Sequence, residues 1–264
     1  MPRRLFSLIA LIALTVAAVT GFSPSTPPAT AAITEKRVAP GRALDGTFVL
    51  KVGGMTAARL TLDAGRDDRR YRVEASIATT GVVRAFREAG IEAEVEGDVG
   101  LIGTHGGLAP RRYRSTSTDE DDVRRVAIDY IGAAPSVRAE PPYDRRNWAI
   151  DPATQTDALD PLSAILSIFG AQEAGTLCDR EIRVFDARRR FAVALAEPEG
   201  PGTDGTISCE ATYRRLGGFK PRLLEEPPFP FRVTFAEGAD GLWQLVRAAG
   251  QSPLGTAVIM REEG

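Results

Sequence analysis

Polar and apolar residues alternate with a period of two along most of this chain, and no other feature constrains its fold as strongly. The clearest example lies between residues 91 and 99, where Ile91, Ala93, Val95 and Val99 alternate with acidic side chains. Such alternation predicts a strand with one face buried and one face in water. Strands that are wet on one side are typical of antiparallel sheets, so the sequence predicts a mainly β protein.

About a dozen segments show this pattern. Besides residues 91–99, the expected strands cover residues 47–52, 59–62, 71–77, 110–117, 123–131, 181–186, 190–196, 206–214, 229–235, 242–247 and 256–261. Gly53 and Gly54 end the first of them, and a Gly-Gly pair tolerates the positive φ angles that a short hairpin requires. A flat sheet of this many strands would expose long edges. We therefore expect a single curved antiparallel sheet, either an open barrel or a β-spiral.

Two short helices are expected between the strands. Asp160 is a suitable N-cap, Pro161 suits the first helical position, and Gly170 ends a segment in which apolar residues recur at helical spacing. A shorter candidate runs from Thr80 to Ala89 and stops at Gly90. We expect these helices to plug one end of the curved sheet or to fill its interior.

The stretch from Pro135 to Pro152 contains four prolines and Trp148, and it is predicted to be a loop. Such a loop could separate two domains, but each half of the chain alone would form a small, unclosed sheet. We expect instead a crossover between two parts of one sheet.

The first 31 residues have the composition of a secretory signal. Arg3 and Arg4 precede an apolar run of 18 residues, and Ala29-Thr30-Ala31 forms a small-x-small cleavage site. A run of this length could also anchor the chain in a membrane, but the prolines after it and the cleavage site favour removal. We predict a signal peptide over residues 1–31, cleaved near Ala31, a flexible lead-in over residues 32–43 and a single β-rich domain over residues 44–264. The mature protein is expected in the periplasm, with no stable membrane span.

Cleavage would leave 233 residues with a net charge of −4, because two arginines and no acidic residue leave with the signal. A mildly acidic domain lacks the electrostatic footprint of a nucleic-acid-binding protein. Lysine occurs only at Lys36, Lys51 and Lys220, so arginine supplies nearly all the positive charge. Guanidinium groups could recognise anionic lipids, although a compositional bias of the genome explains the same excess.

Cys178 and Cys209 are the only cysteines of the chain. Each shares its parity with the inward-facing apolar residues of an expected strand. Two inward-facing thiols on neighbouring strands, in an oxidising compartment, predict a structural disulfide, and their spacing does not match the Cys-x-x-Cys of redox pairs. The bridge would close a loop of about 31 residues, which stabilises the fold by roughly 3–4 kcal/mol in the chain-entropy model.

No segment carries a recognisable catalytic motif. His105, the only histidine, lies in a glycine-rich turn without a rigid partner, so we expect an exposed loop residue. The sequence has no Gly-x-Ser-x-Gly elbow and no Ser-x-x-Lys pair. Residues 200–205 match Gly-x-Gly-x-x-Gly, but a strand rather than a helix follows them, so a wide hairpin loop explains the match. We expect no cofactor and no catalytic residue.

Two kinds of charged cluster remain. The acidic run Asp119–Asp122 could bind calcium, but it lacks the ligand spacing and the glycine of a dedicated loop, so we expect a solvated turn and no metal. Arg111, Arg112, Arg114 and Arg188–Arg190 could form an anion-binding strip. On alternating strands, however, about half of such residues simply point to water.

A set of short motifs occurs in a distinctive order. The motifs are Gly53-Gly54, Thr80-Gly81, Pro110 with Tyr113, Tyr130, Asp160-Pro161-Leu162-Ser163-Ala164, Val184-Phe185-Asp186 with Arg189-Arg190, Cys209 with Tyr213, Gly217-Gly218-Phe219 and Leu254-Gly255-Thr256-Ala257. In this order they resemble an exported bacterial family known as domain of unknown function 3108, over residues 44–260. Ala187 departs from the family pattern, which has glycine after the aspartate. The resemblance implies a cell-envelope protein without assigned activity, similar in layout to spiral-sheet envelope proteins that carry one disulfide and, more loosely, to open-barrel lipid carriers.

These observations favour a non-enzymatic periplasmic protein whose concave, partly apolar face binds a lipid, a lipoprotein or an envelope protein and so supports envelope integrity. An alternative is an interaction module that docks a partner on its sheet edge or on the loop over residues 135–152. A third class, an envelope hydrolase, would need a catalytic group such as His105.

Overall fold

Thirteen strands make up most of the chain in the computed structural model, which describes residues 42–100, 107–144 and 146–262. The N-terminal strands are β1 (Arg42–Val52), β2 (Met55–Arg66), β3 (Arg70–Thr79), β4 (Ala89–Val99), β5 (Leu108–Asp119), β6 (Asp122–Ile131) and β7 (Ala134–Glu140). The C-terminal strands are β8 (Arg180–Phe185), β9 (Arg190–Glu199), β10 (Thr206–Gly217), β11 (Phe229–Glu237), β12 (Trp243–Ser252) and β13 (Gly255–Arg261). The helices are α2 (Gly81–Phe86), α3 (Pro161–Phe169) and α4 (Pro221–Leu224), with 3-10 turns η1 (Pro152–Thr154) and η2 (Ala174–Thr176).

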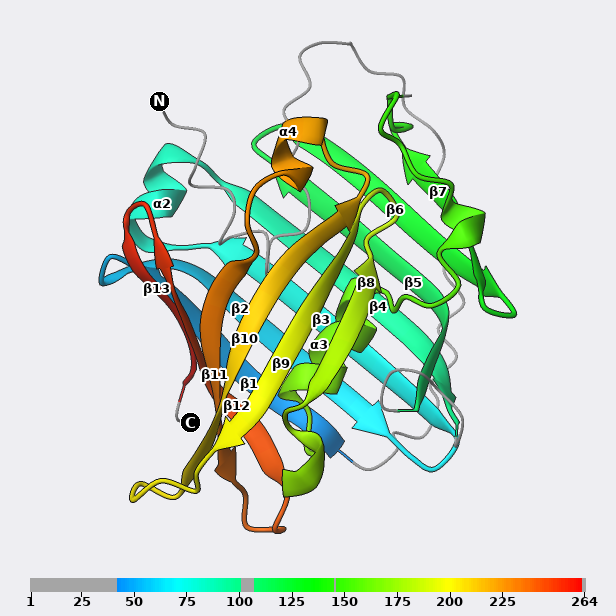
Figure 1. The fold of residues 1–264 in the computed structure, drawn as a ribbon. Helices are drawn as coiled ribbons and strands as arrows, with labels where there is room; N and C mark the ends of the chain where they lie inside the picture. The colour runs from blue at the N-terminus through cyan, green and yellow to red at the C-terminus, as the bar shows by residue number, and fades with distance from the viewer. Residues whose placement is uncertain (1–41, 101–106, 145, 263–264) are drawn as a thin grey trace.

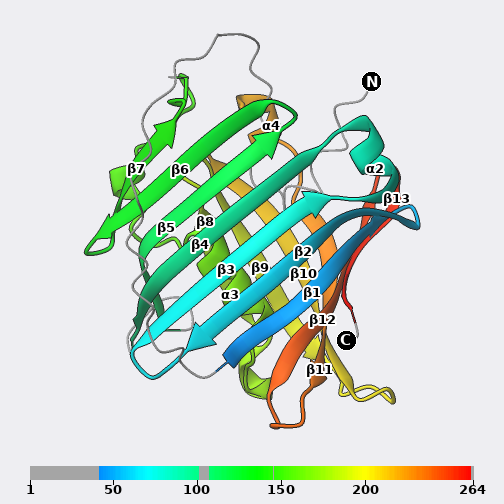
Figure 2. The same cartoon turned by 180° about the vertical axis from the view of Figure 1, so that it is seen from behind.

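All thirteen strands belong to one antiparallel sheet, in the order β7-β6-β5-β4-β3-β2-β1-β13-β12-β11-β10-β9-β8 (Figures 1 and 2). Each half is a meander of hairpins, and the pairing of β1 with β13 joins the two halves. Strands β7 and β8 are the two edges, so the sheet curls round without closing. The predicted fold class, a single curved antiparallel sheet, is therefore confirmed.

Helix α3 lies inside the curl, where it contacts β3, β4 and β5 on one side and β8 and β12 on the other. Asp160 caps it, Pro161 opens it and Gly170 ends it, as the sequence predicted. Seven of its nine residues are buried, and a helix buried on all sides belongs to a core. Phe169 meets Phe48 of β1 edge to face, with ring centres 5.0 Å apart.

The proline-rich stretch is only partly a loop. Residues 134–140 form strand β7, so the prediction of a loop beginning at Pro135 is wrong there. An edge strand tolerates proline because one row of its backbone groups has no partner strand. Residues 141–160 lead from β7 to α3 and make the predicted crossover between the two edges of the sheet.

The second predicted helix is shorter than expected. It covers Gly81–Phe86 instead of Thr80–Ala89, because β4 already begins at Ala89 and pairs with β3. Helix α4 was not predicted, and neither 3-10 turn was. The predicted signal peptide lies outside the described residues, and β1 begins at Arg42, inside the predicted lead-in.

Candidate functional site

The interior of the sheet is filled by side chains. The core consists of inward-facing residues of both halves together with both sides of α3. Its largest fully buried side chains include Tyr71, Phe48, Phe185 and Phe235. The apolar face expected to hold a ligand is therefore covered by the protein's own helix.

A buried polar network fixes the start of α3. The Asp160 carboxylate accepts hydrogen bonds from the backbone N–H groups of Leu162 and Ser163, at 2.9 and 3.1 Å, and from the Ser163 hydroxyl. The hydroxyls of Ser163 and Tyr71 lie 2.7 Å apart, and Tyr71 fits because Gly97 opposite has no Cβ, which would lie 2.4 Å from the ring. Burial raises the pKa of Asp160 to about 6. Asp160 and Ser163 are fully buried. The hydrogen bond between Ser163 and Tyr71 therefore holds α3 against β3 inside the core.

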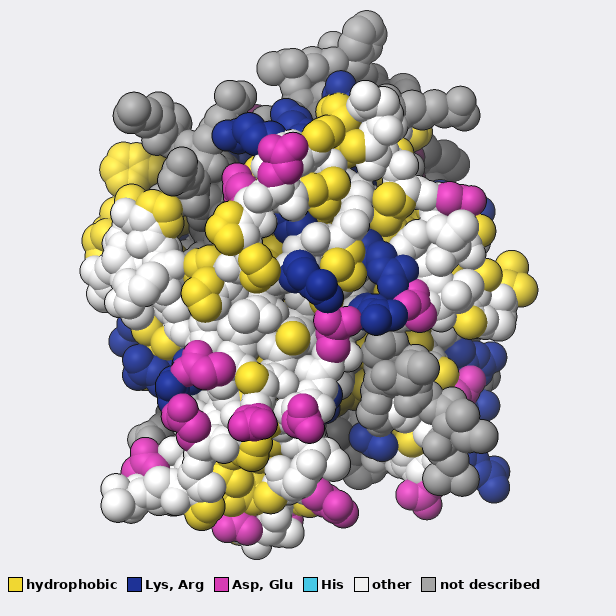
Figure 3. All heavy atoms as spheres, viewed as in Figure 1, with side chains coloured by type: hydrophobic (Ala, Val, Ile, Leu, Met, Phe, Trp, Pro, Cys, Tyr) yellow, Lys and Arg dark blue, Asp and Glu magenta, His cyan; other side chains and the backbone are white. Residues whose placement is uncertain are grey.

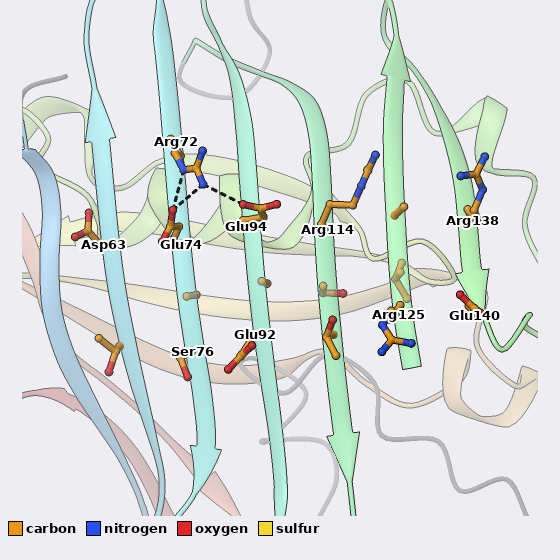
Figure 4. A pocket seen from close by; sticks show the side chains of 17 residues that line it. Asp63, Arg72, Glu74, Ser76, Glu92, Glu94, Arg114, Arg125, Arg138 and Glu140 are labelled. Carbon is orange, nitrogen blue, oxygen red and sulfur yellow. Dashed lines mark hydrogen bonds and ion pairs between the residues drawn. The ribbon is translucent and has the colours of Figure 1, made fainter. Parts of the chain in front are cut away.

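A hollow of about 790 Å³ lies on the opposite, outer face of the N-terminal half, over β2–β7 (Figure 4). Its floor contains the small residues Ala75, Ala93 and Ser115, which pair across β3, β4 and β5. The outward-facing residues on either side of them form its walls. These walls follow from the strand register, since directly opposed residues place their side chains on the same face.

The two sides of the hollow differ in charge. Figure 4 shows the acidic side chains Asp63, Glu74, Glu92 and Glu94 on β2–β4. On β5–β7 it shows the arginines Arg114, Arg125 and Arg138, with the acidic Glu140 among them. Arg72 lies on the acidic side and pairs with Glu74 at 2.8 Å and with Glu94 at 3.1 Å. The hollow can therefore receive a partner that carries charges of both signs.

Several of these charges make no close ion pair. Arg114 pairs with Asp129 at 2.8 Å. Arg125 and Arg138 are exposed and make no ion pair within the part of the chain that the structure describes, although Glu140 lies opposite Arg125 in the register. Glu92 is exposed in the same way. Because these exposed groups form no ion pair of their own, they are available to a partner.

The two cysteines form the predicted disulfide. Cys178 precedes β8 and Cys209 lies on β10, with Cα atoms 5.8 Å apart. Both residues are buried. The bridge closes a loop of 31 residues and ties the edge of the C-terminal half together.

The structure assigns the other predicted candidates to ordinary roles. Residues 200–205 form the loop between β9 and β10, and Asp119–Asp122 forms the turn between β5 and β6, where Asp119 pairs with Arg87. His105 lies outside the described residues. No group of three or more metal-ligating side chains occurs among the residues that are described. No helix in that part of the chain is long and apolar enough to cross a membrane.

The arginines of the predicted anion-binding strip do not come together. Arg111 and Arg112 lie on the outer face of β5, near Asp98, Glu96 and Asp129 at 3.5–3.7 Å. Arg190 pairs with a carboxylate on the outer face of β8–β9. Figure 3 shows that face, with basic and acidic side chains next to one another near its centre.

Sequence reasoning missed the hollow itself. The alternation showed that Glu92 and Glu94 point outward, but only the register shows that Glu94 lies opposite Arg114 and that Thr116 lies opposite Arg125. The sequence does contain an indication of the charged hollow, because the outward positions are acidic in residues 92–98 and basic in residues 111–114.

Fold and site together define an open antiparallel β-barrel with a filled core and a charged hollow on its outer face. Residues 47–201 match the model of the family described as protein of unknown function DUF3108. The match covers more than half of the chain, so the protein belongs to this family, as its motifs predicted.

The other comparisons add no activity. No curated protein matches the chain. Among solved structures, the chain is similar to a β-barrel-like protein of domain of unknown function DUF1849 from Brucella abortus. The two share 11% sequence identity at a TM-score of 0.44, over 86% of this chain and 99% of that chain.

Proposed function

We propose that this protein is exported to the cell envelope and acts there without catalysis, by binding a partner protein on the outer face of β3–β7. The observation that carries the proposal is the pair of exposed arginines in the hollow, Arg125 and Arg138, which make no ion pair in the described chain. The filled interior argues against the version in which a lipid occupies the curl, because α3 already covers the inward apolar surface. Export rests on the basic, apolar and small-x-small pattern of residues 1–31.

The hollow indicates the chemistry of the partner. Neighbouring strands are about 4.8 Å apart, so the acidic side on β4 and the basic side on β6 are separated by roughly 10 Å. An extended segment advances about 3.3 Å per residue. Side chains two or four positions apart on such a segment face the same way. A polypeptide with a basic and an acidic residue at one of these spacings therefore fits across the hollow.

The free edge of the sheet adjoins this surface. Strand β7 carries Arg138 and is the last strand of the sheet. No described strand pairs with its outer side, although the 3-10 turn η1 packs against part of β7. An exposed edge can accept a further strand through backbone hydrogen bonds. A partner segment that enters the hollow is thus within reach of this edge, which unites the charged surface with the predicted edge-docking alternative.

The proposal is tested by photo-crosslinking in cells, with the photoreactive group at Thr116 in the hollow. We expect a defined protein adduct, and we expect Arg125→Glu together with Arg138→Glu to reduce it at least tenfold, because like charges at an interface cost several kcal/mol. The matched control is Arg247→Glu on β12, an exposed arginine without an ion pair in the described chain, which should leave the adduct unchanged.

Three outcomes would contradict the proposal. The first is an adduct that survives the double charge reversal. The second is a lipid bound in a one-to-one ratio in native mass spectra of the purified protein, which would restore the interior carrier. The third is a full-length protein found in the cytoplasm with residues 1–31 still attached, which would refute export.

A further inference from the structure

The turn between β8 and β9 presents two arginines from a rigid base. The Asp186 carboxylate accepts hydrogen bonds from the backbone N–H groups of Arg188 and Arg189, at 3.0 and 2.6 Å. The backbone N–H of Asp186 donates to the Arg189 carbonyl oxygen at 3.0 Å. Gly218 packs directly on this turn, because a Cβ there would lie 2.1 Å from the Arg188 carbonyl oxygen. The backbone below both arginines is therefore held from two sides.

Aromatic rings orient the guanidinium groups. Arg188 from the turn and Arg124 from β6 both lie over the ring of Tyr143, at 5.3 and 5.1 Å from its centre. Arg189 lies 5.4 Å from the ring centre of Phe219. A guanidinium group stacked on a ring keeps its N–H donors in its own plane, available for a ligand.

The positive charge of this cluster is poorly balanced. None of the side chains of Arg124, Arg188 and Arg189 makes an ion pair within the part of the chain that the structure describes. The nearby Asp186 carboxylate is buried and accepts hydrogen bonds from the backbone N–H groups of the turn. Burial lowers the pKa of Arg188, and the charges of Arg189 and Arg124 lower it further.

A polar group without a partner lies at the same place. The Tyr143 hydroxyl is buried and has no hydrogen-bond partner among the described residues. Burial and the charge of Asp186 raise its pKa to about 12, while Arg124, Arg188 and Arg189 act in the opposite direction. The hydroxyl thus lies within electrostatic reach of all three arginines.

The geometry points to a binding site for a phosphate group, formed by Arg124, Arg188 and Arg189 together with the Tyr143 hydroxyl. Three guanidinium groups and one carboxylate leave a net charge of about +2, which a doubly charged phosphate balances and a single carboxylate does not. Arginine also matches phosphate oxygens with paired N–H donors. The site is separate from the hollow, because Arg124 and Arg125 are neighbours in one strand and point to opposite faces.

The test is calorimetric titration of the mature protein with inorganic phosphate at constant ionic strength. We expect saturable binding, and we expect Arg188→Gln to weaken it about tenfold or more, as loss of a charge-assisted hydrogen bond implies. Arg247→Gln on β12 is the matched control and should bind as the wild type does. Circular dichroism shows whether each variant folds, and Arg188→Lys, which keeps the charge but not the paired donors, should bind with intermediate affinity.

A second arm separates the two sources of phosphate. Vesicles of phosphatidylcholine with phosphatidic acid are compared with vesicles of phosphatidylcholine alone in a flotation assay. Binding that requires phosphatidic acid and Arg188 assigns the site to a lipid headgroup, and binding of inorganic phosphate alone assigns it to a soluble phosphate. The proposal is wrong if neither probe binds, or if folded Arg188→Gln and Arg188→Lys both bind as tightly as the wild type.

Discussion

The two halves of the sheet use the same excess of arginine in different ways. On the outer face of the C-terminal half, Asp157 pairs with Arg183 at 2.6 Å and with Arg190 at 2.7 Å. On the same face, Glu181 pairs with Arg214 at 2.8 Å. Arg183, Arg190 and Arg214 are therefore neutralised by neighbouring carboxylates.

The N-terminal half has arginines without ion pairs at the corresponding edge. Arg125 and Arg138 make no ion pair in the described chain, although both lie in a hollow that also contains acidic side chains. The disulfide, too, belongs to the C-terminal half. The difference teaches that arginine content alone does not locate a binding surface, because neighbouring carboxylates neutralise many of these arginines.

Removal of the disulfide tests whether the C-terminal half depends on it. The double variant Cys178→Ala, Cys209→Ala should lower the free energy of unfolding by roughly 3–4 kcal/mol, because the unfolded chain gains the entropy of a 31-residue loop. Chemical denaturation measures the total loss. Hydrogen exchange should show the largest loss of protection in β8–β10.

Wild-type protein treated with a reductant is the control, since it should reach the stability of the double variant without any substitution. A loss of protection spread evenly over β2–β5 and β8–β10 would contradict the view that the bridge serves one half.

Asp160 should make stability depend on pH. Burial raises its pKa in the folded state to about 6, above the ordinary value of 3.8, so the folded chain binds a proton where the unfolded chain has already lost it. Its contribution is complete below about pH 4 and is lost as the pH rises through about 6, a change of about 2–3 kcal/mol. Burial also raises the pKa of Asp186, which acts with the same sign. Denaturation midpoints between pH 4 and 7 measure the slope, and Asp160→Asn should reduce it.

Asp157→Asn is the matched control, three residues away. The hydrogen bond from Arg190 is the main cause that holds the pKa of Asp157 down, at about 2. Its stabilisation is therefore present above about pH 4 and is lost only as the pH falls through 2. A flattened slope between pH 4 and 7 in Asp157→Asn, with the slope kept in Asp160→Asn, would reverse the assignment.

Local sequence rules predicted the elements whose ends are set locally. The strands follow from alternation, and α3 follows from Asp160, Pro161 and Gly170, each of which acts on its own helix end. The disulfide followed from parity, because Cys178 and Cys209 both point inward. These features need no knowledge of which strands pair.

Features that depend on pairing could not be predicted. Strand β7 was missed because Pro135 is typical of a loop, and only its place at the sheet edge makes proline acceptable. The apolar stripe predicted for α3 is really a helix buried all round, since Ser163 and Ser167 are buried as well. The hollow needs the register of six strands, and the arginine cluster needs the crossover that places Tyr143 between β6 and the β8–β9 turn.

The smallest effect concerns Ala187, the residue that departs from the family pattern. Its φ of 76° lies in the left-handed region, which costs an alanine about 1–2 kcal/mol and glycine almost nothing. Ala187→Gly should raise the free energy of unfolding by about 0.5 kcal/mol, because loss of the buried methyl group and the greater entropy of the unfolded chain offset part of the relief. Ala192→Gly on β9 is the matched control, because Ala192 is also buried and has no positive φ. This substitution should lower the free energy of unfolding by about 1 kcal/mol or more. Denaturation curves of the two variants give opposite signs if backbone strain decides the outcome at residue 187. Equal losses would show that the methyl group matters more than the backbone there, and the turn that holds Arg188 and Arg189 would then be unstrained.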